Sequence, residues 1–119
     1  MQNIFVYGTL LNEEILKRLL NCVPQMDNAT LHGFKRVQVE GEAYPAIRPD
    51  SESLVNGAVL YDISDHQLLI LDDYESFHYQ RKKVDVVLID NRSIKCQTYV
   101  YKPQYYRCLL YTSPSPRDA

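Results

Sequence analysis

The apolar and polar positions of the chain follow two periods, one typical of strands and one typical of helices. Runs of apolar and β-branched residues, separated by polar turn segments, predict five strands. The apolar run of the first strand is nearly continuous, which is typical of a buried central strand. The tetrapeptide DNRS (90–93) has the composition of a turn between the last two strands. The predicted strands are residues 3–7, 31–39, 55–63, 82–89 and 94–101.

A proline-containing segment lies between the second and third predicted strands. AYPAIRPD (43–50) follows the turn residue Gly41 and contains two prolines. Because proline lacks the N–H group that a central strand needs, we expect an extended, edge-like segment or a loop here.

Two segments have apolar residues at helical spacing. The first follows Asn12, a favourable N-cap residue, and closes before Pro24. The second begins at a capping box formed by Ser64 and Gln67 and continues as QLLILDDYE. Strands with two inserted helices predict a compact α+β domain built on a curved or closed sheet.

The last twelve residues differ in character from the rest. Residues 108–119 read CLLYTSPSPRDA, and residues 108–118 resemble the translation of a transposase-type sequencing adaptor. The alternative is a natural Ser/Pro-rich disordered tail. We expect residues 1–107 to form one domain and residues 108–119 to be an adaptor-derived, non-native disordered tail that replaces the natural C-terminus.

Composition narrows the class of protein. A chain of 119 residues with 45% hydrophobic and 24% charged residues is ordinary for one globular domain. The net charge of −2 gives no basic surface for nucleic acid, and no apolar run reaches the length of a membrane span. MQNIFVYG, the first eight residues, lacks the features of a signal peptide, so we expect a cytoplasmic chain. The sequence does not indicate an oligomeric state.

The cysteines do not predict thiol chemistry. The chain has three cysteines and no CxxC pair, and neither Cys22 nor Cys96 has a nearby histidine or basic motif that would activate a thiol. We expect both to act as small buried apolar residues.

The second predicted helix carries a candidate catalytic carboxylate. At 100° per residue, Glu75 projects between Leu68 and Leu71 and therefore faces the core in the last turn. Burial raises the pKa of a carboxyl group, which suits it to accept and donate protons near neutral pH. Two alternatives remain: the side chain turns into solvent at a frayed helix end, or it pairs with a base in the segment RKK (81–83).

The other acids of the motif LDDYE have a simpler interpretation. Asp72 and Asp73 project towards solvent or the helix end, and we expect them to be solvated or to form local caps. Because no histidine stands at metal-ligand spacing, we expect no metal site.

The first predicted strand ends as FVYGTL, with Gly8 and Thr9 directly after it. One interpretation is a simple turn from strand to helix. The other is that Gly8 allows backbone amides to face an anionic or carbonyl group of a ligand.

Four segments in order resemble one family. FVYGTL, GFKRVQVEGEAYPAIRP, NGAVLYDI and LLILDDYESFHYQRKKV together are similar to the gamma-glutamylcyclotransferase-like superfamily, and most to its gamma-glutamylamine cyclotransferase and plant avirulence-induced branch. The resemblance spans roughly residues 3–101. It implies a small mixed β-barrel, closed or nearly closed, with flanking helices, and it implies that Glu75 is the catalytic acid/base. The residues that it assigns to substrate binding are Tyr7, Gly8, Thr9, Leu10, Tyr44, Pro45 and Tyr79.

The resemblance implies a cyclotransferase, of transferase or lyase class, that needs no cofactor. It would convert a gamma-glutamyl amine or a related amide to 5-oxoproline and a free amine. One carboxylate can remove a proton from the attacking α-amine and return it to the leaving nitrogen. The alternative is a non-catalytic module of the same fold that binds a small ligand or has a regulatory role. The sequence does not identify the amine half of the substrate.

Overall fold

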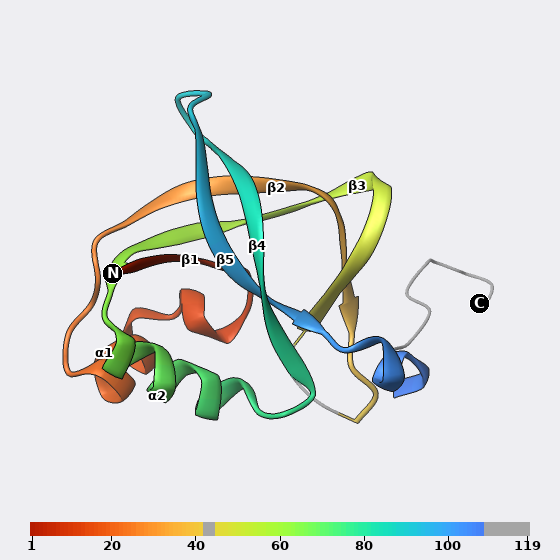
Figure 1. Ribbon diagram of the computed structural model, residues 1–119, viewed down its shortest axis with the longest axis horizontal. Helices are drawn as coiled ribbons and strands as arrows, with labels where there is room; N and C mark the ends of the chain where they lie inside the picture. The colour runs from red at the N-terminus through yellow and green to blue at the C-terminus, as the bar shows by residue number, and fades with distance from the viewer. Residues whose placement is uncertain (42–44, 109–119) are drawn as a thin grey trace.

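The protein is a closed β-barrel with two helices along one side (Figure 1). The computed structural model describes residues 1–41 and 45–108. In this part of the chain five strands form the barrel in the order β1-β3-β2-β4-β5, which confirms the predicted α+β fold. The elements are β1 (Gln2–Val6), the 3₁₀ helix η1 (Thr9–Leu11), α1 (Glu13–Leu20), β2 (Met26–Gln38), β3 (Pro45–Ile63), α2 (Asp65–Glu75), β4 (Tyr79–Leu88), β5 (Ser93–Tyr101) and the 3₁₀ helix η2 (Pro103–Cys108).

Strand β1 lies inside the sheet, as its apolar run predicts. It pairs antiparallel with β3 and parallel with β5, and the other barrel contacts are antiparallel. Alternation along β1 places Ile4 and Val6 in a cluster with the buried residues of the helices. Phe5 and Tyr7 point the other way, into the second cluster of the core. Both faces of β1 are therefore buried, and the turn after it is fixed to the core.

Two predicted strands are much longer than expected, while β4 begins only three residues earlier, at Tyr79. β2 begins at Met26, and β3 runs without a break from Pro45, so the loop alternative is wrong for residues 45–50. The prolines are tolerated because the first half of β3 pairs with β2 alone, while β1 pairs only with residues 58–63. Gly33, with φ of 87°, lies at the irregularity where β2 changes register against β3.

Both helices begin at the predicted caps. The Asn12 side chain accepts hydrogen bonds from the N–H groups of the next turn, and both halves of the Ser64–Gln67 capping box are present. α1 ends at Leu20, before Pro24 as expected, because Asn21 adopts a left-handed conformation with φ of 63°. α2 ends at Glu75, and Ser76 then turns the chain with φ of 80°.

Some predictions concern residues outside the described part of the chain. Tyr44, which the resemblance assigns to substrate binding, is one such residue. The tail predicted at residues 108–119 also lies outside, except for Cys108, where η2 ends. Within residues 1–41 and 45–108, no helix combines the length and the apolar character that a membrane span requires.

Candidate functional site

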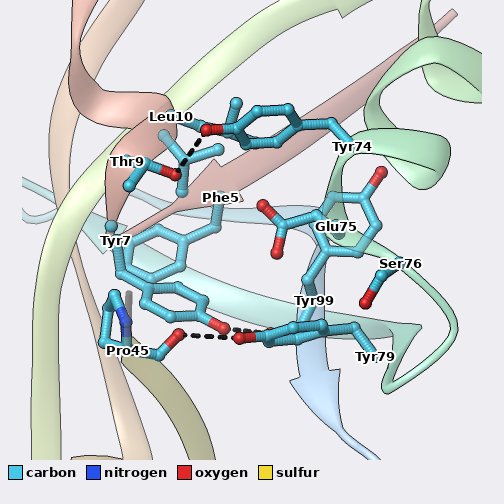
Figure 2. Close-up of a pocket in the computed structure, with 12 residues that line it drawn as sticks. Phe5, Tyr7, Thr9, Leu10, Pro45, Tyr74, Glu75, Ser76, Tyr79 and Tyr99 are labelled. Atoms are coloured by element: carbon cyan, nitrogen blue, oxygen red, sulfur yellow. Dashed lines mark hydrogen bonds between the residues drawn. The ribbon is translucent and has the colours of Figure 1, made fainter. Parts of the chain in front are cut away.

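A cavity of about 220 Å³ opens where the end of β1, the η1 turn and the C-terminal end of α2 meet (Figure 2). It brings together segments that are more than 60 residues apart in the sequence, as the hydrogen bond between Tyr74 and Thr9 illustrates. The predicted site residues that line it are Tyr7, Gly8, Thr9, Leu10, Pro45, Glu75 and Tyr79. Phe5, Val6, Tyr74, Ser76 and Tyr99 complete the lining.

Glu75 points its carboxylate into this cavity (Figure 2). Burial raises the pKa of Glu75 from 4.5 to about 7. Its position at the last residue of α2, the negative end of the helix dipole, acts in the same direction. Within the described residues the carboxylate forms no ion pair, and Arg81 bonds to Asp72 at 2.9 Å instead. The solvent and ion-pair alternatives for Glu75 therefore do not describe this structure.

The turn after β1 is shaped by a close approach at Gly8. Its φ of −133° does not demand glycine, but a Cβ atom there would lie 2.9 and 3.0 Å from two ring carbons of Pro45. The first hydrogen bond of η1 runs from Leu11 N–H to the Gly8 carbonyl, at 2.9 Å. The N–H groups of residues 8–10 come before that bond and therefore have no acceptor within η1, as at the start of any helix. The turn therefore places backbone N–H groups beside the cavity.

Tyrosine hydroxyls fix the walls of the cavity. Tyr7 donates to the Tyr99 carbonyl at 2.6 Å, and Tyr79 donates to the Pro45 carbonyl at 3.0 Å. Tyr74 donates to the Thr9 hydroxyl at 3.3 Å. Burial, and then the charge of Glu75, raise the pKa of Tyr7 well above its usual value, so Tyr7 stays neutral near pH 7.

Replacing Tyr7 with Phe is expected to lower the free energy of unfolding by about 1–2 kcal/mol, because it leaves a buried carbonyl without its 2.6 Å partner. Chemical denaturation at pH 7 measures this change. Tyr61→Phe is the control, since it removes the hydroxyl of an exposed hydrogen bond to Asp27. An equal effect of the two substitutions would contradict the assignment.

The structure corrects the expectation for Asp72. It is not simply solvated or a side-chain cap, because its Oδ1 accepts hydrogen bonds from the Tyr99 hydroxyl at 2.6 Å and from Arg81 Nε at 2.9 Å. Asp73 is exposed, as expected. No signal in the sequence pairs Asp72 with Tyr99, which is 27 residues away on another element.

Neither Cys22 nor Cys96 lines the cavity. Cys96 is buried, as predicted, and burial raises the pKa of its thiol to about 12. Cys22 is exposed, so the expectation of burial is wrong for it. α1 ends before Cys22, which therefore does not share the buried face of that helix. In the described ranges, no three or more His, Cys, Asp or Glu side chains gather as metal ligands would.

Comparisons with known proteins relate the whole barrel to one family. The model of the family described as gamma-glutamyl cyclotransferase, AIG2-like, matches residues 4–115. AIG2-like protein D of Arabidopsis thaliana is 42% identical over 101 residues, which is 85% of this chain and 66% of that protein. A Methanocaldococcus jannaschii protein whose name includes gamma-glutamylcyclotransferase is 37% identical over 83% of this chain and 45% of its own length. The chain thus spans about half to two thirds of these relatives.

Solved structures agree with this relationship. The solution structure of an Arabidopsis thaliana protein superposes with a TM-score of 0.78 at 33% identity, covering 88% of this chain and 67% of that one. A gamma-glutamyl cyclotransferase, at 20% identity, has a TM-score of 0.75 over 90% of this chain and 75% of its own, and shows the shared fold alone. The fold, the family match and the identity to plant relatives together establish that the chain belongs to the gamma-glutamyl cyclotransferase, AIG2-like family.

Proposed function

We propose that this chain is a cyclotransferase that releases 5-oxoproline and a free amine from a gamma-glutamyl amine or a related gamma-glutamyl amide. The observation that carries the proposal is the meeting of one half-buried carboxylate, Glu75, with the turn at residues 7–10 around a single cavity. The family name and the name of one matched relative support the same reaction class.

In the proposed reaction Glu75 acts twice. Its carboxylate first accepts a proton from the α-ammonium group of the substrate, and the freed amine attacks the γ-carbonyl carbon. A bond forms between these two atoms and closes the five-membered ring. Glu75 then returns the proton to the leaving nitrogen as the old amide bond breaks, so the carboxylate is regenerated. The ring nitrogen gives up its second proton to the released amine, which leaves as an ammonium ion. A pKa of about 7 allows both roles near neutral pH.

The turn at residues 7–10 is proposed to hold the gamma-glutamyl group. The amides that precede the first η1 hydrogen bond are available to a carboxylate or to the oxyanion formed during attack. Because Gly8 approaches Pro45 closely, the turn is held in one shape against β3. A fixed, folded-back substrate brings amine and carbonyl together, and this proximity can lower the barrier by several kcal/mol, up to about 7–11 kcal/mol in favourable cases.

The test is product release from a panel of gamma-glutamyl substrates. The purified chain is incubated with gamma-glutamyl alkylamines, with a gamma-glutamyl lysine isopeptide and with glutathione, and 5-oxoproline is measured by mass spectrometry. Release from at least one substrate supports the proposal. Binding of 5-oxoproline, detected as a raised melting temperature, without turnover of any substrate would instead favour the non-catalytic ligand-binding module.

The pH dependence of activity is a second prediction. Because Glu75 must be ionised to accept the first proton, kcat/KM is expected to fall on the acidic side with an apparent pKa of about 7. If the glutamate were not buried, this fall in kcat/KM at acidic pH, the acidic limb, would have an apparent pKa near 4.5. Rates from pH 5 to 9 measure the limb, and an acidic limb below pH 5.5 would exclude Glu75 as the buried base.

A further inference from the structure

Asp72 is a carboxylate that the proposed reaction does not use. It lies on α2 three residues before Glu75, so both acids belong to the final turns of one helix. Its Oδ1 accepts two hydrogen bonds, from the Tyr99 hydroxyl on β5 at 2.6 Å and from Arg81 Nε on β4 at 2.9 Å. Asp72 therefore connects the helix that carries Glu75 to two strands of the barrel.

Tyr99 is held at both ends. Asp72 accepts from its hydroxyl, while its backbone carbonyl accepts from the Tyr7 hydroxyl at 2.6 Å. Only 4% of Tyr99 is exposed. Together with Ser76 and Tyr79, Tyr99 lines the Glu75 cavity and also an open groove of about 900 Å³ outside it. The Tyr99 ring is thus part of the partition between Glu75 and a hollow that is open to solvent.

The ion pair between Asp72 and Arg81 is a poor candidate for a stabilising contact. Their side chains are 34% and 31% exposed, and pairs at such positions contribute only about 0–1 kcal/mol. Hydrogen bonds to a charged group are nevertheless short and directional, and two of them meet on one oxygen here. The arrangement therefore does more to orient Tyr99 than to stabilise the fold.

We propose that Asp72 is a positioning residue of the Glu75 site, acting through Tyr99. Oriented by Arg81, it holds the Tyr99 ring in place as the partition that keeps water from the outer groove away from Glu75. This inference rests on the proposed function of Glu75, because the hydration of this half-buried carboxylate matters to the reaction only if Glu75 is the acid/base.

Loss of this partition has a measurable consequence. Burial is the cause of the raised pKa of Glu75, so water admitted past Tyr99 should lower that pKa towards its ordinary value. The other titratable groups that line the cavity are tyrosines, and burial raises the pKa of two of them, Tyr7 and Tyr99, above its usual value. Two cations act on these tyrosines, Arg36 on Tyr7 and Arg81 on Tyr99, whereas burial is the cause of the raised pKa of Glu75. The tyrosines that line the cavity are Tyr7, Tyr74, Tyr79 and Tyr99.

The first test measures the pKa of Glu75 directly, by ¹³C NMR titration of its carboxyl group in the full chain. Asp72→Ala and Tyr99→Phe are each expected to lower that pKa by about one unit, and the double substitution should add little because both break one hydrogen bond. Asp73→Ala is the matched control, since Asp73 is the exposed neighbouring acid of the same helix. Tyr99→Phe is the smaller change and keeps the test available if Asp72→Ala does not fold.

The second test uses activity. Asp72→Ala is expected to move the acidic limb of kcat/KM to lower pH by the same amount and to lower kcat by about tenfold, because a weaker base transfers protons less effectively. Asp72→Asn should keep the limb near its wild-type position, since its amide oxygen can still accept from Tyr99.

Two results would overturn the inference. One is a Glu75 titration in Asp72→Ala and Tyr99→Phe that matches that of Asp73→Ala. The other is a lower melting temperature with no movement of the pKa, which would mean a purely structural role. The NMR titration does not need turnover, so an inactive wild-type chain would refute the proposed function and still allow this inference to be judged.

Discussion

Replacing Glu75 with Gln is expected to lower kcat for 5-oxoproline release by about a thousandfold or more, because the amide can neither accept the first proton nor return it. The side chain keeps its shape, so the cavity and the binding of 5-oxoproline should persist. Coupled measurement of product release and of ligand-induced melting temperature separates these effects. Glu52→Gln, at an exposed glutamate of β3, is the control and should retain wild-type rates.

The same substitution is expected to stabilise the protein at high pH. A carboxyl group whose pKa is about 7 when folded and 4.5 when unfolded binds its proton more tightly in the folded state. Stability is therefore lost as pH rises from about 4.5 to about 7, and the loss persists above that range. Glu75→Gln removes this cost, which is at most about 3 kcal/mol. Its melting temperature should exceed that of wild type at pH 8 and match it near pH 4, and the opposite order would contradict the burial of Glu75.

The second large effect is expected from Gly8→Ala. The new methyl group would lie 2.9 Å from one ring carbon of Pro45 and 3.0 Å from another, and the stiff proline ring cannot turn aside. The turn must therefore move, which displaces its amides from the reacting group. We expect kcat/KM to fall about a hundredfold, the effect of losing one oxyanion donor. Steady-state kinetics measure the loss, and circular dichroism checks that the barrel remains folded.

A second substitution tests the cause of this loss. Pro45→Ala removes the ring carbons that the methyl group would meet but keeps the carbonyl that accepts from Tyr79. The double variant of Gly8→Ala and Pro45→Ala should therefore recover much of the lost activity. Strictly additive losses would show that the clash with Pro45 is not responsible.

Local sequence signals predicted the helices and the buried first strand because each depends on neighbouring residues. The capping box at Ser64 and Gln67 and the apolar run of β1 are examples. The face of α2 that carries Glu75 followed from helical spacing alone, and the structure places its carboxylate at the cavity. The roles of Glu75 and of the turn at residues 7–10 in substrate chemistry stay predictions.

Features that depend on distant residues could not be predicted. The extension of β3 to Pro45 follows from where β1 stops pairing, and a sequence does not show that edge. The hydrogen bond between Asp72 and Tyr99 joins elements whose distance is set only by the closed barrel. The need for glycine at position 8 likewise arises from a neighbour 37 positions later, Pro45, and not from its own backbone angles.

The parallel pairing of β1 with β5 has a consequence for how the protein is made. Ile4 and Phe5 contact Gln97 and Thr98, so the first strand synthesised must wait for the last before it can be enclosed. Such a high contact order slows folding, because the chain loses the entropy of closing a long loop before these contacts contribute any stability. A growing chain on the ribosome therefore leaves the β5 edge of β1 unpaired until β5 has emerged, which makes early engagement of a chaperone advantageous.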